Sequence, residues 1–273
     1  MTIQGLCIKT GMTRQNYYKE KRLRRVREVD SELVVGFVRR ERRIHPRIGV
    51  RKLLDMLRGD LIKAGVQIGR DKMFRLMKRK GLLVPPLPRN PRTTNSYHSL
   101  PVFRNEIKDL EPTGPDQVWV SDVTYVRTEN AFIYLSVIMD LYSRKIVGYH
   151  SGDNLEASGC IRALEMALRG LGEGSKPIHH SDRGCQYCCH EYVDILSSLD
   201  FVISMTEENH CYENAHVERL HGILKQEYGL GCSFKTKEQA RKAIDNAVWV
   251  YNTLRPHGSL GNRVPEEVHG KAA

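Results

Sequence analysis

The fold of this chain is decided by residues 179–225. The stretch begins His179-His180-Ser181-Asp182-Arg183-Gly184 and ends Glu218-Arg219-Leu220-His221-Gly222-Ile223-Leu224-Lys225. Its first part is the end of a short apolar strand that ends on Asp182, and Gly184 then breaks the strand. Its last part, residues 215–226, has the period of a helix with one apolar and one polar face. One carboxylate therefore ends a strand, and a second lies on a helix face.

A third carboxylate, Asp122, lies in the strand-like run 118–126. Three carboxylates that meet repel each other unless a cation neutralises them, and oxygen ligands of this kind favour Mg²⁺ or Mn²⁺. Two such ions, about 3.5–4 Å apart, can hold the attacking and leaving oxygens of a phosphodiester. The sequence therefore predicts that Asp122, Asp182 and Glu218 are catalytic and bind two Mg²⁺ ions, for which Mn²⁺ can substitute. For any one acid alone, a solvated surface charge is the simpler interpretation.

Four motifs around these acids resemble one protein family. They are Trp119-Val120-Ser121-Asp122-Val123-Thr124-Tyr125, His180-Ser181-Asp182-Arg183-Gly184-Cys185-Gln186-Tyr187, Cys211-Tyr212-Glu213-Asn214-Ala215 with Glu218, and Tyr251-Asn252 with Arg255-Pro256-His257. The resemblance, over about residues 45–270, is to the second-frame protein of the insertion-sequence-three family of bacterial transposases, whose core is similar to a retroviral integrase. Ser121, Cys185 and His210 replace the Thr, Ser and Gly that are usual in the family, and none of them alters an acid.

The resemblance implies an α/β, ribonuclease-H-like catalytic core in a DNA transposase that cleaves its element's ends and transfers the strands. It implies terminal inverted repeats and target DNA as substrates, a homo-oligomer on DNA, and a first-frame protein, or a frameshift fusion with it, as a partner. Lys225 lies within about 20° of the helix face of Glu218, and the family commonly has a basic residue there, so contact with a DNA phosphate is expected. A solvated lysine, a nuclease with the same core and a catalytically silent DNA-binding repressor are the alternatives.

Charge is divided unevenly along the chain. The net charge is +11, but residues 1–105 carry 26 Lys and Arg against 8 Asp and Glu, whereas residues 106–273 carry 17 against 24. A basic front joined to an acidic rear predicts a DNA-binding module attached to a metal-binding one. RNA binding, a membrane surface and simple solubility are alternatives for the charge alone. No run approaches the ~18–20 apolar residues of a membrane helix, which favours a cytoplasmic, nucleoid-associated protein.

The basic front is expected to be helical. Thr13 caps a helix, residues 21–43 are amphipathic with a pattern that allows a break near Asp30 and Ser31, and His45-Pro46 ends that segment. Residues 50–81 then predict a helix, a Gly-containing turn and a second helix, the arrangement of a helix-turn-helix. The second helix carries the basic side chains expected to contact DNA: Arg70, Lys72, Arg75, Lys78 and Arg79. A plain helical hairpin with a solvated basic face is the alternative.

Four domains are expected: a basic helical segment at 1–45, the helix-turn-helix domain at 46–83, a Pro-rich linker at 84–115, and the catalytic core with a C-terminal helix at 116–273. Seven of the eleven prolines lie in residues 84–117, which indicates an extended linker. The core should contain three successive antiparallel strands, followed by alternating helices and strands. The expected strands are 118–126, 132–140, 144–151, 178–181 and 201–205. The expected helices are 157–171, 187–199, 215–226 and 236–254.

Other polar residues near these motifs are assigned different roles. Asp140 ends a strand, and it is expected to accept hydrogen bonds in a turn rather than to bind metal. His179, His180 and His221 are expected to lie beside the metal site or to face DNA, because three carboxylates favour a hard ion. The cysteines of residues 185–190 are expected to be reduced thiols in small helix positions rather than zinc ligands, since no second Cys pair follows at zinc-finger spacing.

Overall fold

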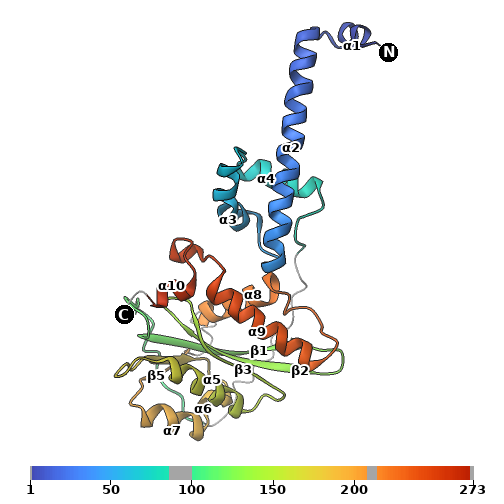
Figure 1. Cartoon of the computed structure of the whole chain (residues 1–273). Helices are drawn as coiled ribbons and strands as arrows, with labels where there is room; N and C mark the ends of the chain where they lie inside the picture. The colour runs from blue at the N-terminus through green and yellow to red at the C-terminus, as the bar shows by residue number, and fades with distance from the viewer. Residues whose placement is uncertain (1, 86–99, 208–213, 271–273) are drawn as a thin grey trace. The chain divides into compact units, whose positions relative to one another are not determined.

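The computed structural model describes residues 2–85, 100–207 and 214–270, apart from the side chains of residues 24–27 and 29. The motif residues 209–213 therefore lie outside the described residues. The chain divides into two compact units, Met1–Pro85 and Pro86–Ala273 (Figure 1). Each unit has a hydrophobic core of its own.

The first unit is helical, and its elements are α1 (Ile3–Thr10), α2 (Arg14–Ile44), α3 (Val50–Lys63) and α4 (Arg70–Arg79). Thr13 caps α2 as predicted, because its hydroxyl accepts a hydrogen bond from the Asn16 amide at 3.2 Å. The break that the pattern allows near Asp30 and Ser31 does not occur, and α2 is one continuous helix. Unlike proline, Asp and Ser both have a backbone N–H that can donate within the helix. A helix therefore tolerates each of them at a cost of about 0.5 kcal/mol.

Helices α3 and α4 pack against the second half of α2. The turn between α3 and α4 contains Gly65, whose φ of 68° lies in the left-handed region that glycine adopts without strain. The core is formed by apolar side chains of all three helices: Val34, Val38, Leu53, Leu57, Leu61, Met73, Leu76 and Met77. Because one face of α4 turns inward at its apolar positions, the opposite face, with its basic side chains, is exposed.

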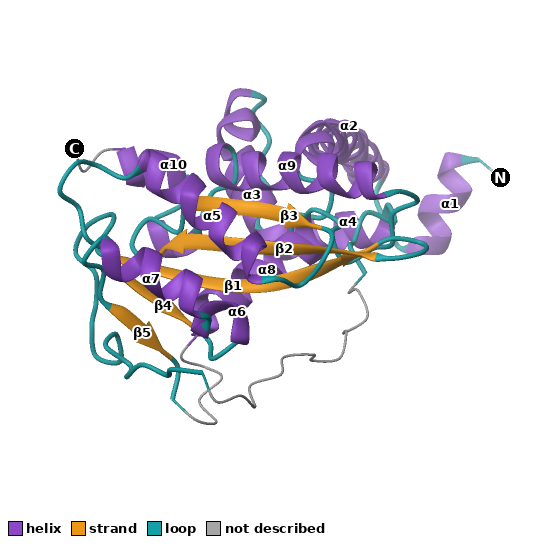
Figure 2. Cartoon of the chain, turned by 90° about the horizontal axis from the view of Figure 1, so that it is seen from below, coloured by secondary structure: helices purple, strands orange, loops and turns teal. Residues whose placement is uncertain are grey.

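The second unit is built on a five-stranded sheet with the order β3-β2-β1-β4-β5 (Figure 2). Its strands are β1 (Val118–Arg127), β2 (Phe132–Asp140), β3 (Ile146–Gly152), β4 (Ile178–Ser181) and β5 (Ile203–Met205). The prediction of three successive antiparallel strands is confirmed, since β2 pairs antiparallel with both β1 and β3. Strand β4 pairs parallel with β1 on one side and with β5 on the other.

Helices cover both faces of this sheet (Figure 1). The elements on one face are α5 (Ala157–Gly170), α6 (Cys185–Cys188) and α7 (His190–Ser198), and those on the other are α8 (Ala215–Glu227) and α9 (Lys237–Thr253). Strand β1 contributes to both cores in alternation, with Val118 and Val120 packed among the side chains of α8 and α9 and Trp119 among those of α5 and α7. The 3₁₀ helix η2 (Gly258–Leu260) and α10 (Pro265–Gly270) follow α9. The result is a three-layer α/β unit, as predicted.

The single helix predicted over residues 187–199 is wrong, because the chain forms α6 and α7 with a break at Cys189. Cys189 has an extended backbone, with φ −68° and ψ 148°. The break lets Tyr187 and Tyr192 turn into the same core, where their rings pack edge to face with centroids 5.4 Å apart. The packing of these two rings therefore overrides the local helical pattern.

The segment before β1 belongs to the second unit. Residues 100–117, all of which are described, contain neither helix nor strand. Phe103 and Ile107 nevertheless pack against the two cores of the unit. This half of the Pro-rich segment is therefore attached to the sheet rather than free of it.

The helices differ in polarity as well as in length. In the described parts of both units, none is long and apolar enough to cross a membrane.

Candidate active site

Asp122 and Asp182 lie side by side at the end of β4. Ser121 of β1 and Ser181 of β4 are partners in the parallel register, so the residues that follow them are at the same level of the sheet. Asp122 Oδ1 accepts a hydrogen bond from the amide of the next residue at 2.8 Å, and Asp182 Oδ1 accepts one from the Gly184 amide at 3.0 Å. Each carboxylate is therefore oriented by the backbone that follows it.

Helix α8 is anchored to β1 next to Asp122. At the start of the helix, Asn214 Nδ2 donates a hydrogen bond to the Ser121 carbonyl at 3.2 Å. The predicted apolar stripe is buried, and it consists of Val217, Leu220 and Leu224. Glu218 lies in the first turn of α8 and is exposed, and a carboxylate there is favoured by the helix dipole. The third candidate acid is thus on the helix that is fixed to the strand carrying the first.

His221 contacts Asp122 directly. Its Nε2 lies 3.2 Å from Asp122 Oδ2, and the imidazole is buried while the Asp122 side chain is 22% exposed. The signal for this contact was helical spacing, because His221 follows Glu218 by three residues on one side of α8. His221 therefore lies beside a candidate metal ligand, one of the two places that the sequence left open for it.

His179 and His180 have a different environment, because both are buried on β4. His179 Nε2 lies 2.9 Å from the Tyr192 hydroxyl, and His180 Nδ1 lies 2.8 Å from Ser204 Oγ. Burial and, as a smaller cause, the positive charge of the neighbouring His180 lower the pKa of His179 to about 3. The alternative in which these two histidines face DNA is therefore wrong, since both are enclosed within the layers of the unit.

Lys225 is half-buried two turns after Glu218 on α8. Its Nζ lies 4.7 Å from the centroid of the Tyr125 ring, a cation–π contact. Burial lowers the pKa of Lys225, and the negative charge of Asp122 opposes that shift. The ammonium therefore lies within electrostatic reach of Asp122 and is not a fully solvated surface charge.

The donors available to a cation here are carboxylate oxygens, which fit Mg²⁺ or Mn²⁺. Among the described residues, the group of three possible ligands whose atoms lie within 4.8 Å of one another is Asp116, Asp140 and His269. The carboxylates of Asp122, Asp182 and Glu218 are therefore spaced more widely than that.

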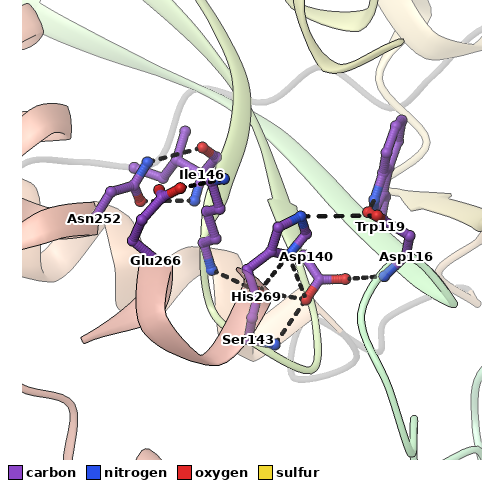
Figure 3. Close-up of polar contacts among 9 residues, drawn as sticks. Asp116, Trp119, Asp140, Ser143, Ile146, Asn252, Glu266 and His269 are labelled. Carbon is purple, nitrogen blue, oxygen red and sulfur yellow. Dashed lines mark hydrogen bonds and ion pairs between the residues drawn. The ribbon is translucent and has the colours of Figure 1, made fainter. Parts of the chain in front are cut away.

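The group of Asp116, Asp140 and His269 attaches α10 to the sheet (Figure 3). Asp140 is 0% exposed, and it accepts hydrogen bonds from the Asp116 amide at 2.8 Å, the Ser143 amide at 2.7 Å and the Ser143 hydroxyl at 2.5 Å. His269 Nε2 lies 3.7 Å from Asp116, and Nδ1 lies 3.7 Å from Asp140. The Ser143 hydroxyl lies closer still to Nδ1, at 3.0 Å, so the ring of His269 links α10 to both Asp116 and the Asp140 turn. The prediction that Asp140 accepts hydrogen bonds in a turn is confirmed.

Among the described residues, no three cysteine sulfurs lie within 4.8 Å of one another. The cysteines outside position 211 are free thiols. Cys188 is buried with its Sγ 3.7 Å from Met205 Sδ, as expected for a thiol in a small core position, whereas Cys185 is exposed.

The DNA-binding candidates of the first unit all lie on α4 and are exposed: Arg70, Lys72, Arg75, Lys78 and Arg79. Arg70 Nε forms an ion pair with Asp71 Oδ1 at 2.9 Å, and Arg75 Nε donates to the Asp71 carbonyl at 3.3 Å. The exposed side of α4 is therefore basic, and its contact with DNA stays a prediction.

The sequence matches two models of one family and several bacterial relatives. Residues 112–211 and 199–265 each match a model described as an integrase core domain. The chain is 34% identical to the "Insertion element IS600 uncharacterized 31 kDa protein" of Shigella sonnei, over 98% of this chain and 100% of that protein. It is 32% identical to the "Transposase InsF for insertion sequence IS3A" of Escherichia coli (strain K12), over 89% of this chain and 82% of that protein.

Solved structures of viral integrases are similar to this chain in fold. The simian T-cell lymphotropic virus intasome in complex with PP2A regulatory subunit B56 gamma matches with a TM-score of 0.50 and 19% identity, over 81% of this chain and 70% of that chain. The HTLV-2 integrase catalytic core domain in complex with magnesium matches with a TM-score of 0.47 and 22% identity, over 58% of this chain and 99% of that chain. The matched integrase core models and the transposase relatives indicate the same family. The chain belongs to the IS3 family of DNA transposases and has a ribonuclease-H-like, integrase-type core.

Proposed function

We propose that this transposase cleaves and joins DNA strands at a site formed by Asp122, Asp182 and Glu218 with two Mg²⁺ ions, which Mn²⁺ can replace. The observation that carries the proposal is the parallel register of β1 and β4, which puts Asp122 beside Asp182. The bond from Asn214 to Ser121 supports it, because it attaches the helix of Glu218 to the same strand.

Asp122 and Asp182 would hold one ion, and Glu218 would complete the site of the second. Bound ions of this kind stabilise the negative charge that develops on the attacking and leaving oxygens. Water attacks a phosphodiester at the element's end, and the 3′-hydroxyl released there attacks a phosphodiester of a second strand. His221 orients Asp122 through the contact at 3.2 Å, and Lys225 holds a neighbouring phosphate. No covalent protein intermediate is required.

The DNA partners follow from the two units. The exposed basic face of α4 would hold the terminal inverted repeats, and the acidic core would act on them and on target DNA. Assembly as a homo-oligomer on DNA, with a first-frame protein or as a frameshift fusion, would bring two ends together, in the cytoplasm at the nucleoid. The intasome to which the fold is similar is consistent with such an assembly.

Purified chain incubated with labelled element-end duplexes and Mg²⁺ or Mn²⁺ tests the proposal. We expect a nick that exposes a 3′-hydroxyl, followed by a joined product, and neither in EDTA. Hydrolysis of RNA–DNA hybrids without joining would instead identify a nuclease with the same core. Tight end binding with no cleavage in either metal would identify a silent repressor.

A further inference from the structure

A basic hollow lies in the second unit, apart from the three candidate acids. Its volume is about 660 Å³, and its walls come from the segment before β1, the turn after β2, the start of α8 and the chain after α9. Three basic side chains line it, one each from the turn, the helix and the last segment: Arg144, His216 and Arg263. Among the described residues that line it, Glu111 is the one carboxylate.

Arg144 is held in this hollow by an uncommon backbone conformation. Its φ is 63°, in the left-handed region that side chains other than glycine seldom adopt. The conformation is fixed by the Arg144 amide, which donates to the Asp140 carbonyl at 2.9 Å, and Asp140 is itself fixed by the Ser143 turn. Nη1 of Arg144 is buried and has no hydrogen-bond partner within the protein. A buried guanidinium N–H normally has an acceptor, so this nitrogen is suited to one supplied from outside.

The charges around Arg144 are not balanced by the protein. Burial lowers the pKa of Arg144, although Tyr251 and Asp140 oppose the shift. Burial also lowers the pKa of His216, and the positive charge of Arg144 lowers it further. The oxygens of Asp140 already accept three hydrogen bonds, and Glu111 is exposed. An anion in the hollow would stabilise the positive charge of Arg144 and would favour the protonated form of His216.

We propose that this hollow binds a phosphate of the DNA backbone, with Arg144 as the buried donor and His216 and Arg263 beside it. The choice of DNA as ligand rests on the proposed function. His216 precedes Glu218 by two residues on α8, which turns the two side chains about 200° apart. The bound phosphate therefore belongs to DNA that passes the active site, not to the scissile group.

Full-length chain and a fluorescent random-sequence duplex in EDTA test this site without any cleavage. Each phosphate contact contributes about −0.9 to the slope of log K against log salt concentration. Arg263→Gln and Arg144→Gln should each reduce that slope by about one and weaken binding about fivefold at moderate salt. Arg144→Lys should keep the slope, because it keeps the charge. Glu111→Gln should tighten binding, because it removes the opposing carboxylate.

Arg169→Gln is the matched control, since it removes an exposed arginine of α5 outside the hollow. Thermal unfolding of every variant separates lost binding from lost folding, and the exposed positions 111 and 263 keep the test open if Arg144→Gln unfolds. A slope for Arg263→Gln equal to that of the control, together with an affinity for Glu111→Gln equal to that of the control, would overturn the proposal, while strand cleavage would leave the proposed function standing. Stabilisation by inorganic phosphate that needs Arg144, with the duplex slope unchanged, would assign the hollow to a free anion and overturn the DNA assignment.

Discussion

Two groups of acidic residues lie at different points along β1, and they are built in opposite ways. Beside the start of β1, Asp140 is the last residue of β2. It is 0% exposed and accepts three hydrogen bonds from Asp116 and Ser143. Further along β1, Asp122 is 22% exposed, with one oxygen on the next amide and the other near His221. Glu218, on α8, is exposed.

The difference shows how the surroundings of a carboxylate decide what it is able to bind. A carboxylate whose oxygens are occupied by fixed donors has little capacity to bind an ion or a substrate. Carboxylates that are partly exposed and close to like charge attract a cation instead. Surroundings, not residue type, therefore separate the two groups.

The largest expected effect is on the group around Asp122. Asp122→Asn, Asp182→Asn and Glu218→Gln should each reduce cleavage and joining by more than about 100-fold, the loss that residues behind a metal ligand can already cause. End binding should persist, because it resides mainly in the basic front of the chain. Gel assays of labelled element ends would measure both activities.

Glu165→Gln, which neutralises an exposed acid of α5, is the control and should retain full activity. Each active-site variant should unfold at the wild-type temperature or above it, since a repelling charge has been removed. Normal cleavage by any of the three variants would remove that residue from the site and weaken the comparison.

The second prediction concerns the saturated group. Asp140→Asn should lower the free energy of unfolding by about 2–3 kcal/mol, because buried donors from Ser143 and Asp116 lose a charged acceptor. Cleavage per folded molecule should remain near wild type. Urea denaturation and cleavage assays of one preparation would show whether stability and activity separate in this way.

This stabilisation should also depend on pH. Burial alone would raise the pKa of Asp140, but His269, Ser143 and the Asp116 amide lower it below its ordinary value of 3.8. The contribution is therefore present above about pH 4 and is lost as the pH falls through the lower folded-state pKa. Asp140→Asn should be less sensitive to acid than wild type in that range, and an unchanged acid transition would contradict the assignment.

The third prediction is a smaller effect, at Lys225. Lys225→Ala should reduce joining about tenfold, corresponding to one charge-assisted contact of about 1.5 kcal/mol. Lys225→Arg should retain most activity, because a phosphate accepts either cation. If the alanine variant joins and binds ends like wild type, Lys225 serves only its contact with Tyr125.

The smallest expected effect is on the pH dependence of stability, and it concerns the histidines. His179 is enclosed beside aromatic rings, whereas His221 contacts Asp122. The pKa of His179 is about 3 when folded, against an ordinary value of 6.5. Between these values the unfolded chain binds the extra proton, so stability falls as the pH falls. His179→Gln should lessen the loss between pH 8 and pH 6 by about 1 kcal/mol or less, measured by denaturation at both pH values. An identical loss in both proteins would show that other groups cause it.

Much of the fold followed from the sequence because its signals are local. Thr13 before a helix, alternation along β1 and an apolar stripe on α8 are properties of neighbouring residues, and the structure has them all. The pattern left a break in α2 open, and the helix is continuous there, whereas the unbroken helix predicted over residues 187–199 was wrong. In the second case Tyr187 and Tyr192 outweigh local preference through a contact that no periodicity contains.

The three candidate acids were found from residue type, spacing and a family resemblance, and their catalytic role remains a prediction. Tertiary structure decided what surrounds them. The contact of His221 with Asp122, the bond from Asn214 to Ser121 and the contact of His269 with Asp140 join segments about 90 to 130 residues apart. Sequence periodicity specifies on which face of its own helix or strand a side chain lies. Which other element that face contacts is decided only when whole layers pack, because this contact depends on the position of every element between them in the chain.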